Sequence, residues 1–251
     1  MVNLLSPSRS ECASDRLYDV KMRTRKAQKV RAMVFDFAGQ ELNGLRCLDI
    51  GCSIGVISSV LAENFGSVIG IDLDAPSLHW AQSNNQRPNA FFINADGMQI
   101  PFPSGIFDVV ICAQCYEHVT DAIRLSNEVY RLLKPGGICI FTGPNRFAII
   151  EDHYGLPFLS WLPRSLADRY LRLTKRGQYY DVNPLAYREL RNLWKKFEIK
   201  DYTFLMLREP VKYWIDDEVK GNAWLKYLPE WFLRILLVFA PNYNWILQKP
   251  D

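Results

Sequence analysis

The stretch that decides the fold reads LRCLDIGCSIG from residue 45 to residue 55 and GSVIGIDLDAP from residue 66 to residue 76. Each part contains a short apolar run, then an acidic residue, and then residues that favour a turn or the start of a helix. Residues 46–50 and 68–72 are therefore predicted strands, with a helix at 55–65 between them. A strand, a helix and a second strand in this order predict a parallel pair joined by a right-handed crossover.

The alternation of strand and helix continues outward from this stretch. A basic amphipathic helix precedes it at residues 21–38, and further apolar runs bounded by Gly, Pro or Asp follow it. The other predicted strands are 90–94, 107–112, 138–142, 199–207 and 243–248, and the other predicted helices are 74–85, 120–133 and 184–197. We therefore expect an α/β fold, with a Rossmann-like, seven-stranded, mostly parallel sheet and helices on both faces.

Two stretches fit neither a strand nor a simple turn. They are residues 145–182, after the fifth strand, and residues 208–242, between the last two strands, and they hold 14 of the 33 aromatic residues. We interpret them as helical, aromatic insertions in one domain that spans residues 1–251. In this division residues 1–40 form an N-terminal helical cap, residues 45–144 the ligand-binding core, and the insertions a lid or a region that contacts a membrane or an acceptor.

Composition narrows the class of protein. The chain is 49% hydrophobic and 23% charged with a net charge of +3, which is ordinary for a globular protein and makes nucleic acid an unlikely partner. The six cysteines lack metal-ligand spacing, so no metal site is expected, and the single CxxC at Cys112 and Cys115 reads as two structural thiols. Free thiols favour a reducing compartment, and we see no signal peptide in residues 1–10, so we expect a cytoplasmic protein. The longest apolar run near the end, residues 231–240, is shorter than the ~20 residues of a membrane span.

Six of the 30 lysine and arginine residues lie within residues 21–31. Such a segment attracts an anionic lipid surface or RNA, but no RNA-binding module is recognisable. We favour the simpler interpretation, a solvated face on a helix that closes the binding site.

The strand ends carry a recognisable set of polar groups. Ligands of doubly wound sheets bind outside the carboxyl ends of the strands, where the loops after residues 50, 71, 94 and 112 should meet. Small residues at 51–55 allow the backbone to approach a ligand, and the helix that follows offers free N–H groups. Asp72 could accept hydrogen bonds from both ribose hydroxyls of an adenosine, and Asp96 could accept one from an adenine amino group.

Three patterns compete for the glycine loop. A nicotinamide fingerprint, G-x-G-x-x-G, does not fit Gly51, Ser53 and Gly55. A G-x-S-x-G nucleophile elbow fits by letter, but only one predicted strand precedes it and no oxyanion loop is present, so we reject it. The third pattern is the methyltransferase loop, acid-x-G-x-G-x-G.

The order of these motifs resembles one family. From residue 47 to residue 145 the chain is similar to the type 11 family of class I S-adenosylmethionine (SAM)-dependent methyltransferases, which includes ubiquinone and menaquinone biosynthesis enzymes. The matching landmarks are LDIGC at 48–52, GID at 70–72, Asp96 before IPF at 100–102, FDVV at 107–110, EHV at 117–119 and LKPGG at 133–137. The chain departs from the family pattern at Ser53, where the middle glycine is expected.

The resemblance implies a role for each matching position and SAM as the cofactor. Asp49 and the loop of Gly51, Cys52, Ser53 and Gly55 would hold the methionyl part. Asp72 would bind the ribose, Leu73 would pack on the adenine, Asp96 and Gly97 would lie at the adenine edge, and Gln114 would lie near the sulfonium.

The expected reaction is an in-line methyl transfer to a hydrophobic or lipid-linked small molecule, at oxygen or carbon. A base is needed only if the acceptor must lose a proton, and the candidates are His118, His153 and Tyr154, with Glu117 beside them. The mixture of aromatic, leucine and cationic residues in the insertions fits a membrane interface, or equally a lid packed on its own core. The alternative functions are an RNA methyltransferase and a SAM-binding partner protein without catalysis; the sequence does not indicate an oligomeric state.

Overall fold

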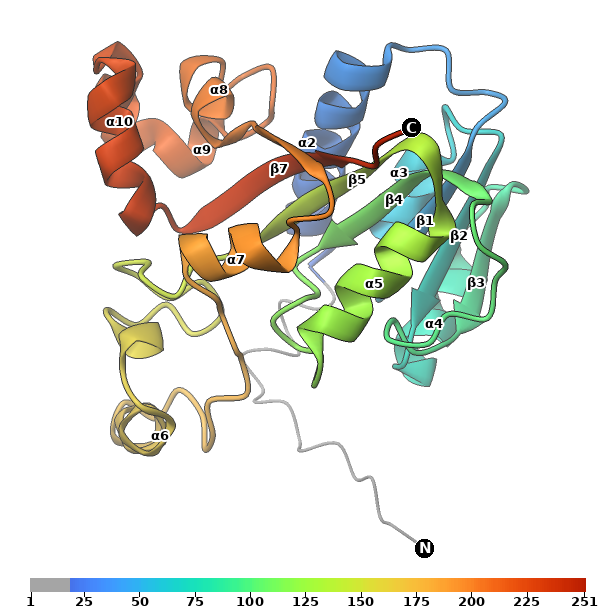
Figure 1. The fold of residues 1–251 in the computed structure, drawn as a ribbon. Coiled ribbons are helices and arrows are strands. Elements are labelled where there is room, and N and C mark those ends of the chain that lie inside the picture. Colours follow the sequence, from blue (N-terminus) through green and yellow to red (C-terminus); the bar gives the residue numbers. More distant parts are fainter. Residues whose placement is uncertain (1–18) are drawn as a thin grey trace, which may run out of the picture.

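The computed structural model describes residues 19–251, apart from the side chains of residues 222, 223, 225, 226, 230 and 234, so the first part of the expected cap lies outside the described residues. The described chain forms one seven-stranded sheet in the order β3-β2-β1-β4-β5-β7-β6 (Figure 1). Only β7 runs antiparallel to its neighbours, which confirms the predicted mostly parallel sheet. The strands are β1 (Arg46–Ile50), β2 (Ser67–Asp72), β3 (Ala90–Asn94), β4 (Phe107–Ala113), β5 (Leu133–Pro144), β6 (Glu198–Asp201) and β7 (Asn242–Gln248).

Helices cover both faces of this sheet, as predicted (Figure 1). One face packs against α5 (Ala122–Leu132) and α7 (Tyr187–Leu193), and the other against α2 (Val20–Ala38) and α3 (Val56–Leu61). Successive strand residues enter opposite cores: Leu48 and Val110 face α5, while Cys47 and Val109 face α2. This alternation of buried side chains explains why the central strands read as continuous apolar runs.

The predicted helix starts are only partly confirmed. Asp121 caps α5, because its Oδ1 accepts from the backbone N–H groups of Ile123 and Arg124 at 3.0 and 3.1 Å. α4 (Ala75–Asn84) also begins as predicted, with a proline in its first turn. By contrast, α3 and α7 are shorter than the predicted helices at 55–65 and 184–197, since turns or extended backbone occupy the remainder.

The strand predicted at residues 199–207 is wrong in its second half. β6 ends at Asp201, whose Oδ1 accepts from the N–H of Thr203 at 2.9 Å and turns the chain out of the sheet. Residues Thr203–Arg208 then form α8. Tyr202 and Met206 pack into the α2-side core, so tertiary burial decides between helix and strand here.

The first insertion has an apolar cluster of its own, whereas the second also packs into the two cores of the sheet through Tyr213, Ile215 and Leu237. The first contains η1 (Leu159–Trp161) and α6 (Arg164–Leu173) around its own apolar cluster, and Figure 1 shows α6 beyond the end of the sheet where β4 and β5 finish. The second contains α9 (Asp216–Val219), η2 (Lys220–Tyr227), α10 (Glu230–Leu236) and η3 (Leu237–Phe239). The insertions meet where the rings of Trp161 and Phe239 stack, with centroids 6.1 Å apart. Among the described residues, no helix combines the length and the apolarity that crossing a bilayer would require.

Gly55 is the position in the loop where a side chain should cost most. Its φ is +72°, and a Cβ would lie 2.5 Å from the Phe92 ring and 2.9 Å from the Ala81 Cβ. We expect Gly55→Ala to lower the free energy of unfolding by about 2–4 kcal/mol, from backbone strain plus overpacking. Gly44→Ala is the matched control, because a Cβ there meets nothing within 4 Å. Denaturant titration of both variants gives the answer, and equal stabilities would contradict the tight approach of α4 and β3 to this loop.

Candidate functional site

Two acidic side chains lie at the carboxyl ends of the adjacent parallel strands β1 and β2. Asp49 is buried, and its Oδ2 accepts a hydrogen bond from the Ser58 hydroxyl at 2.6 Å. Burial, reinforced by the nearby charge of Asp72, raises the pKa of Asp49 to about 7. The two carboxylates are therefore neighbours at one edge of the sheet, beside the point where strand order reverses between β1 and β4.

The loop from Gly51 to Gly55 is folded tightly against β2. Gly51, Ser53 and Gly55 all have left-handed backbone angles, with φ of +72°, +50° and +72°. The N–H groups of Gly51 and Cys52 both donate to the carbonyl of Ile71, at 2.8 and 3.0 Å. The chain thus bends over the end of β2 before α3 begins at Val56.

The N–H of Ser53 ties this loop to the second acid. It donates to Asp72 Oδ2 at 2.8 Å, while the N–H of Asp74 donates to Asp72 Oδ1 at 2.9 Å. The carboxylate is therefore held in one orientation, with remaining lone pairs for a ligand. The Ser53 hydroxyl is buried and has no hydrogen-bond partner in the described chain. A buried hydroxyl without a partner is rare and fits a site that a polar ligand completes.

The other predicted binding residues follow along the same edge. Leu73 is 65% exposed immediately after Asp72, which suits a surface for a flat ring. Asp96 Oδ1 accepts from the N–H of Met98 at 2.8 Å, and a Cβ on Gly97 would come within 3.0 Å of Ile50. Gln114, at the end of β4, donates from its side chain to Asn242 Oδ1 at 2.8 Å.

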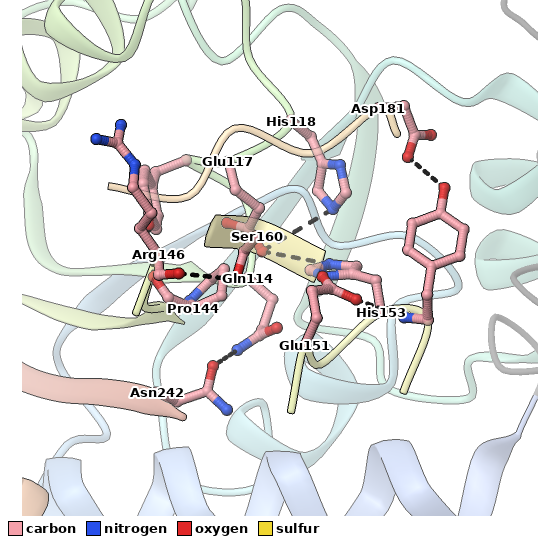
Figure 2. A network of polar contacts seen from close by, with 12 residues as sticks. Gln114, Glu117, His118, Pro144, Arg146, Glu151, His153, Ser160, Asp181 and Asn242 are labelled. Carbon is pink, nitrogen blue, oxygen red and sulfur yellow. Dashed lines mark hydrogen bonds and ion pairs between the residues drawn. The ribbon is translucent and has the colours of Figure 1, made fainter. Parts of the chain in front are cut away.

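A second polar cluster lies beyond the end of β4 (Figure 2). Glu117 Oε1 is 3.6 Å from His153 Nε2 and 3.9 Å from His118 Nε2. Glu117 is fully buried, whereas the side chains of His118 and His153 are 44% and 23% exposed. Burial raises the pKa of Glu117 to about 7, although the nearby His153 lowers it. Hydrogen bonding to Glu151 and the surrounding carboxylates raise the pKa of His153 against the opposing effect of its burial.

The ligand atoms of Glu117, His118 and His153 lie within 4.8 Å of one another. A cation could be accommodated at such a spacing, and the sequence did not predict it. The sequence gives no local pattern for this cluster, because His153 belongs to the first insertion, far along the chain from the EHV motif.

Tyr154, the third candidate base, makes its contacts within the first insertion. Its hydroxyl donates to Asp181 Oδ1 at 2.7 Å, and its ring packs in the apolar cluster around α6. Burial and the Asp181 carboxylate both raise the pKa of Tyr154. The hydroxyl is thus a hydrogen-bond donor within the fold.

Helix α2 brings cationic side chains close to the carboxylates of this site, and the sequence did not indicate that some of these cations are buried. Arg23 acts electrostatically on Asp49. Burial lowers the pKa of Lys26, opposed by the nearby carboxylates of Asp152 and Glu117. The expected solvated basic face is wrong for Lys29, which is buried. One side of α2 therefore lies close to Asp49 and Glu117.

A surface hollow lies beside the loop of residues 51–55, but Asp49 and Asp72 do not line it. It is lined in part by Val20, Ile54, Trp80 and Arg87.

Comparison with known proteins agrees with these features. A family model described as a methyltransferase domain matches residues 48–141. The ubiquinone biosynthesis O-methyltransferase of Psychrobacter arcticus is 36% identical over 130 residues, which are 47% of this chain and 50% of that protein. This chain thus spans about half the length of that relative. The protein of the same name from Pseudomonas entomophila is 31% identical over 164 residues, 61% of this chain and 69% of the relative.

Solved structures support the fold. The S-adenosylmethionine-dependent methyltransferase of Mesorhizobium loti superposes with a TM-score of 0.59 at 18% sequence identity, covering 88% of this chain and 95% of that one.

The buried Asp49 should make stability depend on pH. Its pKa is about 7 in the folded protein and about 4 in an unfolded chain, so the unfolded state loses its proton first as pH rises. The free energy of unfolding should fall as pH rises from about 4 to about 7 and then level off, by an amount on the order of 2–4 kcal/mol for this group. Urea titrations at pH 5 and pH 8 test this. The stability of Asp49→Asn relative to wild type should increase between the two, and an unchanged difference would contradict the burial of this carboxylate.

Proposed function

This chain belongs to the type 11 family of class I SAM-dependent methyltransferases, and from that membership we propose that it transfers a methyl group from SAM to a hydroxyl of a small hydrophobic acceptor. The observation that carries the proposal is the hydrogen bond from the Ser53 N–H to Asp72. The Ser53 hydroxyl beside it is buried and has no hydrogen-bond partner in the described chain. The relatives named above are O-methyltransferases by name, which favours an oxygen acceptor over carbon.

We assign the cofactor's parts to the residues along the strand ends. Asp49, Gly51, Cys52, Ser53 and Gly55 would hold the methionyl part, with the free Ser53 hydroxyl as a polar contact. Asp72 would accept from the ribose hydroxyls, and exposed Leu73 would pack on the adenine. Asp96 and Gly97 would lie at the adenine edge, and Gln114 beside the reacting centre.

The bound cofactor supplies a methyl group that is already activated for displacement. What remains for the protein is to orient the acceptor, exclude water and remove a proton where necessary. The carboxylates at the strand ends favour a cationic ligand, and Gln114 is fixed by its bond to Asn242 so that it can line the methyl-transfer position. Arg23 and Lys26 of α2 would lie beside the bound cofactor, since they interact electrostatically with Asp49 and Glu117.

The insertions are the proposed acceptor region, and they suit a hydrophobic molecule at a membrane surface. The first exposes Ile149, Ile150, Phe158 and Trp161, which are 40–50% exposed, and the second exposes Trp231 and Ile235, at 65% and 58%. The stacked pair Trp161 and Phe239 joins the two exposed regions. Exposed aromatic and aliphatic side chains in short helices insert readily into the boundary between headgroups and acyl chains.

The ribose role of Asp72 predicts a loss of cofactor binding. Asp72→Asn should weaken binding of S-adenosylhomocysteine at least about 30-fold, since hydrogen bonds to a charged group contribute about 1.5–3 kcal/mol each. Asp108→Asn is the matched control, because Asp108 lies at the opposite end of the sheet beside Lys134. Calorimetry should find wild-type affinity in the control, and equal affinities for all three proteins would refute the assigned site.

The membrane contact predicts a defect in vesicle binding. The double variant Trp231→Ser, Ile235→Ser should co-sediment with anionic phospholipid vesicles on the order of tenfold less than wild type, because it loses two apolar side chains that would insert. Ile123→Ser removes a similarly exposed residue, 67% exposed on α5, and should leave partitioning unchanged. Identical partitioning of the double variant and wild type would contradict the contact.

A further inference from the structure

We propose that Glu117, His118 and His153 bind a divalent transition-metal ion of the zinc class, and that this ion ties the first insertion to the loop after β4. The inference goes beyond the proposed methyl transfer and does not depend on it, because it concerns which ion the protein holds and which segments that ion joins. The sequence expectation of no metal site rested on the spacing of the cysteines, and this cluster contains no cysteine.

The first argument is geometry. Glu117 Oε1 lies 3.6 Å from His153 Nε2 and 3.9 Å from His118 Nε2, and the three side chains each offer a ligand atom within 4.8 Å of the others. Figure 2 shows these side chains pointing toward one another. Zinc binds imidazole nitrogen and carboxylate oxygen at about 2.0–2.2 Å, which separates the ligand atoms of a tetrahedral site by about 3.4 Å. Small rotations of the two partly exposed imidazoles close the difference.

The second argument is the state of the Glu117 carboxylate. Glu117 is completely buried, yet neither of its carboxylate oxygens has a hydrogen-bond partner in the described chain. The histidine nitrogens, at 3.6 and 3.9 Å, are too far away for a hydrogen bond. Because buried charges are paired or coordinate metals, these oxygens indicate a ligand, and the converging imidazole nitrogens indicate that the ligand is a metal ion.

The third argument is the orientation of His153. Its Nδ1 lies 3.1 Å from Glu151 Oε1, which leaves its Nε2 directed toward Glu117. Glu151 is itself buried, and its Oε2 accepts from the Tyr154 N–H at 2.6 Å, so this carboxylate is held in place. A metal-binding histidine almost always donates its other ring N–H to a carboxylate, a backbone carbonyl or water. The contact between Glu151 and His153 therefore provides the support that a metal ligand needs.

The fourth argument is charge. Glu117, Glu151 and Asp152 all act electrostatically on His153. Lys26 of α2 lies close to Asp152 and Glu117 and offsets only part of this negative charge. Since attraction between opposite charges is strong in a buried site, the surroundings favour a divalent cation.

The ligand set selects the class of ion. Imidazole nitrogen suits zinc, copper, iron and nickel, whereas magnesium and calcium prefer sites built from oxygen ligands. Two histidines with one glutamate also form one of the known zinc ligand sets, in which water fills the fourth position. The cluster therefore favours an ion of the zinc class over magnesium or calcium.

The ligands come from two segments of the chain. Glu117 and His118 follow β4, whereas His153 belongs to the first insertion. The side chains of His118 and His153 are 44% and 23% exposed, so an ion from solvent can reach their nitrogens. The Asn183 N–H, just after this insertion, already donates to the Glu117 carbonyl at 2.9 Å. An ion bound here adds a second, side-chain cross-link between the proposed acceptor region and the sheet edge.

Metal titration of untagged, metal-free protein tests the site. Calorimetry should show one Zn²⁺ bound per chain, and an excess of Mg²⁺ should not displace it. Co²⁺ should give visible absorption bands without the charge-transfer band that thiolate ligands produce. At a free Zn²⁺ concentration about 100 times its Kd, Tm should rise by about 5–10 °C, because the ion binds the folded state alone.

Four variants locate the ion. Glu117→Gln and His153→Gln each remove a ligand and should weaken Zn²⁺ binding more than about 100-fold, since even a supporting group contributes about 10–100-fold. Glu151→Gln removes such a supporting group and should weaken binding about 10–100-fold. His79→Asn is the matched control, because it replaces the remaining histidine, which is exposed on α4, and it should bind Zn²⁺ as wild type does.

The cross-link has a readout of its own in backbone hydrogen exchange. Zn²⁺ should slow exchange in residues 117–119 and 150–156 of wild type, but not in residues 208–242. In His153→Gln the same Zn²⁺ concentration should leave exchange in all three ranges unchanged.

Several results would overturn the site. They are a wild type that binds no stoichiometric Zn²⁺, equal affinities in wild type, Glu117→Gln and His153→Gln, a thiolate band in the Co²⁺ spectrum, and displacement of Zn²⁺ by an excess of Mg²⁺. Binding at these residues without slower exchange in residues 150–156 would contradict the cross-link. None of these results bears on the proposed methyl transfer, which the affinity for S-adenosylhomocysteine tests separately.

Discussion

The site depends on one constraint, the hydrogen bond from the Ser53 N–H to the Asp72 carboxylate. It fastens the loop that leaves β1 to the acid that ends β2, alongside the hydrogen bonds from the Gly51 and Cys52 N–H groups to the Ile71 carbonyl. The left-handed residues of the loop and the small cross-section of Gly55 against Phe92 permit this bend. Asp49 then lies buried behind the loop, where its charge is costly to the folded state and valuable only to a cationic ligand.

The rest of the chain is arranged around this edge. Helix α2 lies near this edge, and its Arg25 pairs with Asp216 at 2.8 Å while the Tyr213 hydroxyl donates to Asp36 at 3.0 Å. These contacts connect the cap to the second insertion. The first insertion brings His153 to Glu117. The insertions thus contact each other and the side chains around the site.

The sequence allowed the core to be predicted but not the insertions. Helices join the strands from β1 to β5 except between β3 and β4, and the buried residues of these strands recur at spacings that depend only on neighbours in the chain. The run TFLML after β6 fits a helix or a strand equally, and the packing of Met206 under α2 decides for the helix. The sequence marks His153 as a candidate base, but its pairing with Glu117 depends on the path of a long insertion. The buried charges of α2 likewise depend on tertiary packing, which no local pattern encodes.

The most direct test of the central claim is a crystal structure of the protein with S-adenosylhomocysteine. The account predicts the ribose hydroxyls within hydrogen-bond distance of Asp72, the adenine against Leu73, and the amino-acid end over the loop from Gly51 to Gly55 with a contact to the Ser53 hydroxyl. A ligand bound instead in the hollow beside Trp80 and Arg87, with Asp49 and Asp72 untouched, would contradict it.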